Sequence, residues 1–221
     1  MEADIALSDA ALGLLALILA LHQRMRFQLT PCNTEPPIRA NLYRAMQWIL
    51  LSTVFGAWLG AYWHAFLAND PGLLAQIIWR LTLVAIGCTA YGFALFGLYL
   101  LRPNPSQARP RPIIRIIIPI ILLAYLTALL IWEDFLLAIV VYLPAVLFAM
   151  IGFTRPPLCS HQRLGITGLG LILIASAYQQ WGPDIHPQWL THNAVYHLLL
   201  MLALLLFYQA VRLAVMEQKR P

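Results

Sequence analysis

The sequence predicts an all-α membrane protein with seven transmembrane helices, and three observations lead to that prediction. Of the 221 residues, 61% are apolar and only 10% carry charge, whereas soluble domains are typically about 45–50% apolar and about 25% charged. Seven apolar runs meet or approach the roughly 20 residues that a helix needs to cross the hydrocarbon core. The basic residues are concentrated in alternate connections between these runs, which is typical of cytoplasmic loops.

The seven runs follow one another in a single domain over residues 1–221. The expected helices lie near 5–22, 44–67, 76–101, 113–132, 134–153, 164–181 and 192–215. Only "WED" separates the fourth run from the fifth, which predicts a tight turn, and Pro119 and Pro144 predict kinks inside these two helices. The acidic start "MEADIALSDA" differs from the basic start of a secretory signal, so we expect the first run to remain as a membrane helix.

Charge predicts the orientation. If the N-terminus is outside, the first, third and fifth connections and the C-terminal tail are cytoplasmic, and they hold thirteen of the fourteen Lys and Arg residues. Arg80 is the one exception, and seven of the nine acidic residues fall on the outer side. This bias predicts an outer N-terminus and a cytoplasmic C-terminus, in the cytoplasmic membrane of a bacterium. The net charge of +5 arises in these connections, which indicates membrane lipids rather than nucleic acid as partners.

Four of the six histidines are expected at the outer face, at similar depths. His64, in "LGAYWHAFLAND", lies about 5 Å inside the outer end of the second helix, and His197 lies about 8 Å from the start of the last helix. His192 opens that last helix, and His186 lies in the loop before it. Three protein ligands and one water form a catalytic zinc site, and neutral imidazole is the commonest metal ligand. The pattern therefore predicts a zinc ion on His64 and His197 with His192 or His186 as third ligand; a hydrogen-bonded polar cap over the bundle is the alternative.

The spacing of the last two histidines constrains this site. His192 and His197 are five residues apart, about 140° out of phase on a regular helix, so they share one ion only if the helix starts at or after His192. Thr191 or Asn193 is a suitable N-cap for such a start. Asn193 precedes His197 by four residues and lies on the same face of the helix. We therefore expect it to orient a metal-binding histidine through a hydrogen bond.

Candidate catalytic side chains come from the outer connections. Asp184, Glu133 or Asp134 serves as general base if a loop folds over the site. Arg80 lies about one turn into the third helix, where we expect it either to reach the headgroups or to pair with one of these acids.

The motifs around the histidines resemble those of the superfamily of alkaline ceramidases and progestin/adipoQ receptors. The likeness rests on "GAYWH", on "HNAVYH" and on the number of helices. The resemblance implies a seven-helix membrane protein with a zinc ion held by three histidines, and many members hydrolyse lipid amides. His64 and His197 match the family's motif directly and His192 matches with a shift of one residue, whereas Gly60 stands at the family's serine and the segment of Arg80 lacks its aspartate. The sequence is also similar to uncharacterised bacterial seven-helix proteins.

These observations predict a zinc-dependent membrane hydrolase that acts on a lipid or amphipathic substrate at the outer face. Zinc would lower the pKa of a bound water and polarise a carbonyl group. Two alternatives stay open. The first is a b-type haem protein with His64 and His197 as axial ligands, and the second is a non-enzymatic, receptor-like or structural bundle whose histidines sense external pH.

Overall fold

A computed structural model describes residues 2–28, 37–101, 112–154 and 159–217, and these ranges contain helices and no strands. The prediction of an all-α protein is confirmed, and each of the seven predicted ranges contains a helix. The helices are α1 (Ala3–Gln28), α2 (Pro37–Tyr62), α3 (Leu73–Leu100), α4 (Pro112–Ala128), α5 (Phe135–Phe153), α6 (Ser160–Trp181) and α7 (His192–Glu217). A π-helical turn, η2 (Trp63–Leu67), continues α2 at its end.

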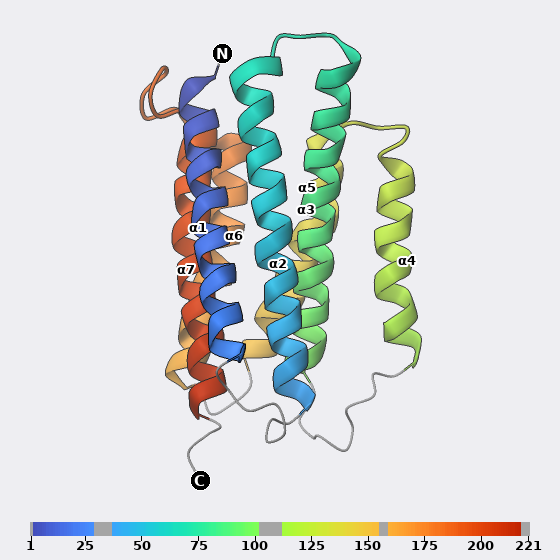
Figure 1. Cartoon of the computed structure of the whole chain (residues 1–221), viewed down its shortest axis with the longest axis vertical. Helices are drawn as coiled ribbons and strands as arrows, with labels where there is room; N and C mark the ends of the chain where they lie inside the picture. The colour runs from blue at the N-terminus through green and yellow to red at the C-terminus, as the bar shows by residue number, and fades with distance from the viewer. Residues whose placement is uncertain (1, 29–36, 102–111, 155–158, 218–221) are drawn as a thin grey trace.

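The helices run up and down in one bundle (Figure 1). Six of them close a ring, because α1 packs on α2, α2 on α3, α3 on α5, α5 on α6, α6 on α7 and α7 back on α1. Helix α4 stands outside this ring and packs mainly on α3. The two termini lie at opposite ends of the bundle.

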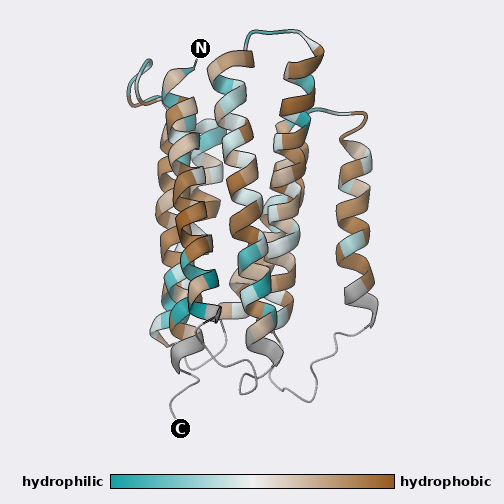
Figure 2. Ribbon diagram, in the orientation of Figure 1, coloured by the Kyte–Doolittle hydropathy of each residue, from teal (hydrophilic) through white to brown (hydrophobic). Residues whose placement is uncertain are grey.

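Five helical segments are long and apolar enough to cross a membrane: Ala3–Arg26, Ala40–Leu67, Leu73–Leu100, Phe135–Phe153 and His192–Ala214. Large apolar side chains such as Leu14, Phe55 and Ile131 point outward, each more than half exposed. Figure 2 shows hydrophobic residues along the length of the bundle and hydrophilic residues gathered toward its ends. This arrangement is that of an integral membrane protein, because a bilayer covers such a surface and water does not.

The two ends of the bundle differ in charge, so we name them the acid-rich end and the arginine-rich end. At the acid-rich end, near the N-terminus, lie Glu2, Asp4, Asp9, Asp70, Glu133, Asp134 and Asp184. At the arginine-rich end lie Arg24, Arg26, Arg44, Arg163 and Arg212. Arg80 is the described arginine that lies at the acid-rich end.

Aromatic side chains fill the half of the bundle toward the arginine-rich end. Phe93, Phe96, Phe153 and Phe207 are each at most 1% exposed, and their ring centroids lie 5.0 to 6.2 Å apart in the contacting pairs. Gly168 allows helix α6 to approach α7 closely. A Cβ on this residue would stand 2.8 Å from the backbone nitrogen of Phe207. This half of the bundle is therefore tightly packed.

The connection between α4 and α5 is longer than the predicted turn at "WED". Helix α4 ends at Ala128, and residues 129–131 form a hydrogen-bonded turn in which Leu129 N–H donates to the Tyr125 carbonyl. Asp134 then caps α5, since its Oδ1 accepts from the backbone N–H of Leu136 over 2.8 Å. Capping by this aspartate fixes where α5 begins, so the turn occupies the residues before it.

Candidate functional site

A buried carboxyl–imidazole pair joins α1 to α7 near the acid-rich end. Oδ1 of Asp9 lies 3.1 Å from Nε2 of His197, and both side chains are about 10% exposed, at 9% and 10%. The other ring nitrogen, Nδ1, lies 2.9 Å from Oγ of Ser8, the residue before Asp9. Two successive residues of α1 therefore engage both nitrogens of one imidazole.

The hydrogen-bond pattern determines where protons can lie in this cluster. Ser8 donates its hydroxyl hydrogen to the Ile5 carbonyl over 2.9 Å, so it accepts from Nδ1 of His197. The hydrogen between Nε2 and Oδ1 then belongs either to a neutral Asp9 carboxyl group or to a doubly protonated His197 ring. In both forms the Asp9–His197 pair holds a proton that can move along the bond.

His64 is held by the first residues of the chain. Its Nδ1 lies 2.5 Å from Oε2 of Glu2, and its backbone carbonyl accepts from the Glu2 N–H over 3.2 Å. His64 lies in the π-helical turn η2, whose extra residue per turn changes the direction of the side chains relative to a regular helix. The turn and the double contact with Glu2 together orient the imidazole.

His192 begins α7 and also carries a carboxylate partner. Oδ1 of Asp184 accepts from the His192 backbone N–H over 2.6 Å and lies 2.8 Å from its Nδ1. These contacts, the backbone bond first, hold the pKa of the Asp184 carboxyl below its usual value. Thr191 caps the helix by accepting from Ala194 N–H over 3.4 Å, and its hydroxyl donates to Asp4 of α1 over 2.6 Å. The predicted start of the helix at His192 is confirmed.

One cavity of about 340 Å³ receives these groups. Its lining includes Asp9, His64, His192 and His197 at the acid-rich end, and Ser52 and Thr89 deeper in the bundle. From His64 back to Ser52 the lining covers twelve residues of helix, which is a length of about 18 Å. The cavity is therefore elongated along the bundle axis, and its histidines and its aspartate lie at one end.

Aromatic and aliphatic side chains form much of the remaining wall. The Trp79 ring lies 4.9 Å from that of Trp63 and 6.3 Å from that of Phe135, and Trp79 and Phe135 both line the cavity. Leu12, Ile86 and Leu200 add aliphatic surface from three helices. A cavity with an ionisable end and apolar walls suits a molecule that has a polar group and an apolar chain.

The structure brings together three of the four histidines that the sequence indicated. His64, His192 and His197 line the same cavity, and so does Asn193, to which the described contacts assign no hydrogen bond with His197. His186 does not line the cavity; its Nδ1 accepts backbone N–H groups of Gln188 and Trp189, each over 3.2 Å.

The described contacts give the three imidazoles partners other than a shared metal ion. Among the described residues, no three His, Cys, Asp or Glu side chains are grouped so that they could hold one metal ion. Each of the three imidazoles is instead hydrogen-bonded to a carboxyl group of its own, from Glu2, Asp184 or Asp9.

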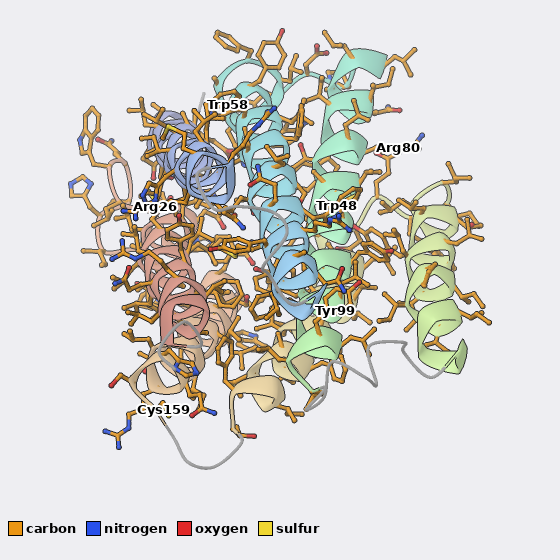
Figure 3. The ribbon with its side chains drawn as sticks, turned by 60° about the horizontal axis from the view of Figure 1, so that its bottom comes forward. Arg26, Trp48, Trp58, Arg80, Tyr99 and Cys159 are labelled. Atoms are coloured by element: carbon orange, nitrogen blue, oxygen red, sulfur yellow. The ribbon has the colours of Figure 1, made fainter. Side chains whose placement is uncertain are left out.

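The four candidate catalytic side chains lie outside the cavity lining. Arg80 pairs with Glu133, which is one of the two arrangements expected from the sequence. The Nε atom of Arg80 is buried without a partner among the described residues. Figure 3 shows Arg80 on the side of α3 that faces α4. Asp134 caps α5, and Asp184 acts on the cavity only through its contact with His192.

Sequence reasoning missed Asp9, Ser8 and the role of Gly60. Asp9 was counted among the outer acids, although it falls inside the first apolar run, and an ionisable residue within a membrane helix indicates a functional site. A Cβ on Gly60 would stand 2.6 Å from Oδ2 of Asp9, so the carboxyl group occupies the space of a side chain at that position. The aspartate within the first apolar run was therefore the sequence feature that could have indicated this site. Gly60, one turn before His64, provides the space for its carboxyl group.

The fold and the site define the class as an all-α, membrane-type helical bundle with a histidine- and carboxylate-lined cavity at one end. The chain belongs to DUF6962, described as a family of unknown function, whose match covers residues 5–215. That match contains all the cavity-lining residues, from Ile5 to Leu200. Comparison with curated proteins and with solved structures gives no match.

Proposed function

We propose that this chain is a membrane hydrolase that cleaves an amphipathic, lipid-like substrate with histidine–carboxylate pairs as its acid and base. One observation carries the proposal: His64 and His192 line one cavity, and each has a carboxylate at Nδ1. A carboxylate can only accept, so Nδ1 holds the proton and Nε2 of a neutral ring keeps its lone pair. This is the arrangement in which an imidazole serves as a general base.

His64 is the proposed base, because its side chain is 15% exposed and lies deeper than that of His192, at 38%. Nε2 of His64 accepts a proton from a water as the water oxygen bonds to the carbonyl carbon of an ester or amide. The Asp9–His197 pair donates its shared proton to the leaving oxygen or nitrogen as that bond breaks. The proton taken up by His64 then returns to the pair, so that each group regains its starting form.

The proposed substrate class follows from the shape and lining of the cavity. A polar carbonyl group would lie among His64, Asp9 and His197, while an acyl chain would lie along the apolar wall of Leu12, Ile86 and its neighbours. The elongated lining, about 18 Å along α2, favours an extended chain over a compact ligand.

We further propose that all seven helices cross the bilayer, with the acid-rich end outside and the arginine-rich end in the cytoplasm of a bacterium. Five described segments have the required length and hydropathy, and α4 contributes a shorter apolar helix. Positive charge gathers on the cytoplasmic side of membrane proteins, and the described arginines other than Arg80 lie at one end.

A second candidate is a non-enzymatic, receptor-like bundle. It is favoured by the carboxylates of Glu2 and of α1, which also join segments of the bundle: Glu2 contacts η2, Asp9 contacts α7, and Asp4 contacts Thr191. Protonation of these groups would loosen the outer ends of three helices without any turnover. Zinc binding and haem binding stay predictions that elemental analysis and a Soret absorption band test directly.

The deciding experiment measures hydrolysis by purified protein in nanodiscs against a panel of fluorogenic acyl esters and acyl amides of increasing chain length. His64→Gln is expected to lower the rate by about 10²–10⁴-fold, the usual contribution of a positioned general base. His186→Gln is the matched control, because this exposed loop histidine lies outside the cavity and should retain the full rate. No turnover above that of empty nanodiscs, or equal loss in both variants, would reject the hydrolase.

A further inference from the structure

The connection between α6 and α7, residues 182–191, is a small hairpin with a defined shape, which we name the α6–α7 hairpin. His186 and Leu190 exchange two backbone hydrogen bonds, of 3.1 and 3.0 Å. At the base of the hairpin, Oδ1 of Asp184 accepts from the backbone N–H of His192, the first residue of α7, over 2.6 Å. These contacts fix the hairpin against the end of the bundle.

Most backbone N–H groups of the α6–α7 hairpin have an acceptor within the chain. At the tip, Nδ1 of His186 accepts from the N–H groups of Gln188 and Trp189, each over 3.2 Å. At the base, the Thr191 N–H donates to Oδ2 of Asp4 over 3.0 Å. Two further positions of the hairpin are prolines, which have no N–H group. A backbone with few free donors can lie where water is scarce.

The α6–α7 hairpin and the residue before it expose large apolar side chains. Trp181 is 83% exposed, Ile185 is 66% exposed and Trp189 is 70% exposed. These two tryptophans are the most exposed of those in the chain. Tryptophan combines a large apolar surface with one polar N–H group, and it is enriched where a membrane meets water.

The α6–α7 hairpin lies at the level of one membrane surface. Helix α6 ends at Trp181, and the segment of α7 that can cross a membrane begins at His192. The hairpin, orange in Figure 1, projects outside the ring of helices beside the N-terminus, and Figure 3 also shows it outside that ring. Because it points away from the bundle instead of across it, the lipid headgroups around the protein are the surface that it meets.

The charges of the α6–α7 hairpin indicate which headgroups it fits. Residues 182–191 contain no lysine or arginine, and Asp184 is the one acid among them. The carboxylate of Asp184 contacts both the backbone N–H and Nδ1 of His192. The hairpin therefore has no basic side chain with which to attract anionic lipid, and its apolar side chains must supply the binding free energy.

We propose that the α6–α7 hairpin is an interfacial anchor that inserts Trp181, Ile185 and Trp189 among the lipid headgroups of the leaflet at the acid-rich end. Neutral lipids such as phosphatidylcholine are sufficient for this contact. The paired backbone of the hairpin suits the headgroup region, which holds less water than the solution does. The anchor is separate from the cavity and does not depend on the proposed hydrolase activity.

The test places a nitroxide spin label at Ile185→Cys in a cysteine-free background, in phosphatidylcholine nanodiscs. Oxygen concentrates in the bilayer and a nickel chelate stays in water, so an inserted label should collide more with oxygen. Asn69→Cys is the matched control, because Asn69 is exposed in the connection between η2 and α3 at the same end of the bundle. Its label should collide mainly with nickel. Equal behaviour at the two positions, or shielding of the Ile185 label from both reagents by protein, would overturn the anchor.

A second substitution tests whether the tryptophans hold the hairpin in the lipid. Trp189→Ser in the protein labelled at Ile185→Cys should remove most of the preference for oxygen. Trp132→Ser is the control, since Trp132 is 62% exposed in the connection between α4 and α5 and lies outside the hairpin. This substitution should leave the label where it was, and an equal change in both variants would overturn the role of the hairpin. Insertion that appears only after phosphatidylglycerol is added would overturn the neutral lipid surface as the partner.

Discussion

The carboxyl group of Asp9 on α1 occupies the place where Gly60 on α2 would carry a side chain. A Cβ built on Gly60 stands 2.6 Å from Oδ2 of Asp9, while Oδ1 of the same carboxyl group lies 3.1 Å from His197 on α7. Three helices therefore meet at one carboxyl group. One oxygen of Asp9 lies against α2 and the other contacts α7. A substitution at Gly60 on α2 should therefore displace the carboxyl group relative to His197 on α7.

We expect Gly60→Ala to destabilise the protein by about 1–3 kcal/mol, the usual cost of overpacking a filled interior. The added methyl group must push Asp9 away from His197, so the hydrolysis rate should fall as well. Thermal or denaturant unfolding in detergent, combined with the nanodisc assay, measures both effects.

Gly170→Ala is the control for that substitution. Gly170 is also helical, but a Cβ there meets no atom within 4 Å. Replacing it should raise stability by about 0.5–1 kcal/mol, because alanine loses less backbone entropy in a helix. Similar destabilisation in both variants would contradict the proposed crowding of Asp9.

Substitutions of Asp9 should separate its structural role from its chemical one. Asp9→Asn retains a group that can donate to Nε2 of His197, so the loss of stability should stay below about 1 kcal/mol, whereas Asp9→Ala leaves that nitrogen unpaired and should cost about 1–3 kcal/mol. Both variants lack an ionisable carboxyl group and should lose hydrolysis. A fully active Asp9→Asn protein would show that the pair only stabilises the fold.

Stability should fall in acid through Asp184. Its folded pKa lies below the unfolded value of 3.8 because the His192 backbone and side chain stabilise the ionised carboxylate. The contact therefore contributes stability above about pH 4, and the contribution is lost as pH falls through the lowered folded pKa. Unfolding curves of the wild-type and Asp184→Asn proteins should differ by a constant amount at neutral pH and converge in acid.

The variant His192→Gln refines this pH test. It keeps the backbone N–H that makes the larger contribution to the lowered pKa of Asp184. Part of the acid dependence should therefore persist in His192→Gln, and its complete loss would assign the effect to the imidazole instead.

The proposed topology can be tested by labelling single cysteines in a cysteine-free background. Asp70→Cys and Gln188→Cys lie in exposed connections at the acid-rich end, and Arg163→Cys is exposed at the arginine-rich end. An impermeant maleimide added to intact spheroplasts should label the first two and spare the third. The reverse pattern would place the N-terminus in the cytoplasm, and labelling of all three would mean that the membrane was not sealed.

The helices could be predicted from the sequence because bilayer thickness fixes the length of an apolar run. Boundaries differed where side chains decide them, as at Asp134, whose capping bond fixes the start of α5. The gathering of His64, His192 and His197 could also be foreseen, because charge set the orientation and 1.5 Å per residue set their depth.

The partners of these histidines could not be derived in the same way. Depth along a helix leaves its rotation unknown, so nothing in the spacing showed that Asp9 faces α7 rather than lipid. Likewise, His64 was assigned to a regular helix, and a π-helical turn has no simple sequence signature. The carboxylate partner of each imidazole comes from a different segment, at Glu2, Asp184 and Asp9, and no spacing in the sequence indicated these contacts.

The π-helical turn η2 makes the direction of His64 depend on chain length as well as on residue type. A π turn holds one residue more than a regular turn, and each residue corresponds to about 100° of helix rotation. Removing one residue between Trp63 and Leu67 would therefore restore regular winding and swing the ring relative to Glu2. Among DUF6962 members, an insertion or deletion at this point would mark chains whose histidine has turned away, even where every surrounding letter is unchanged.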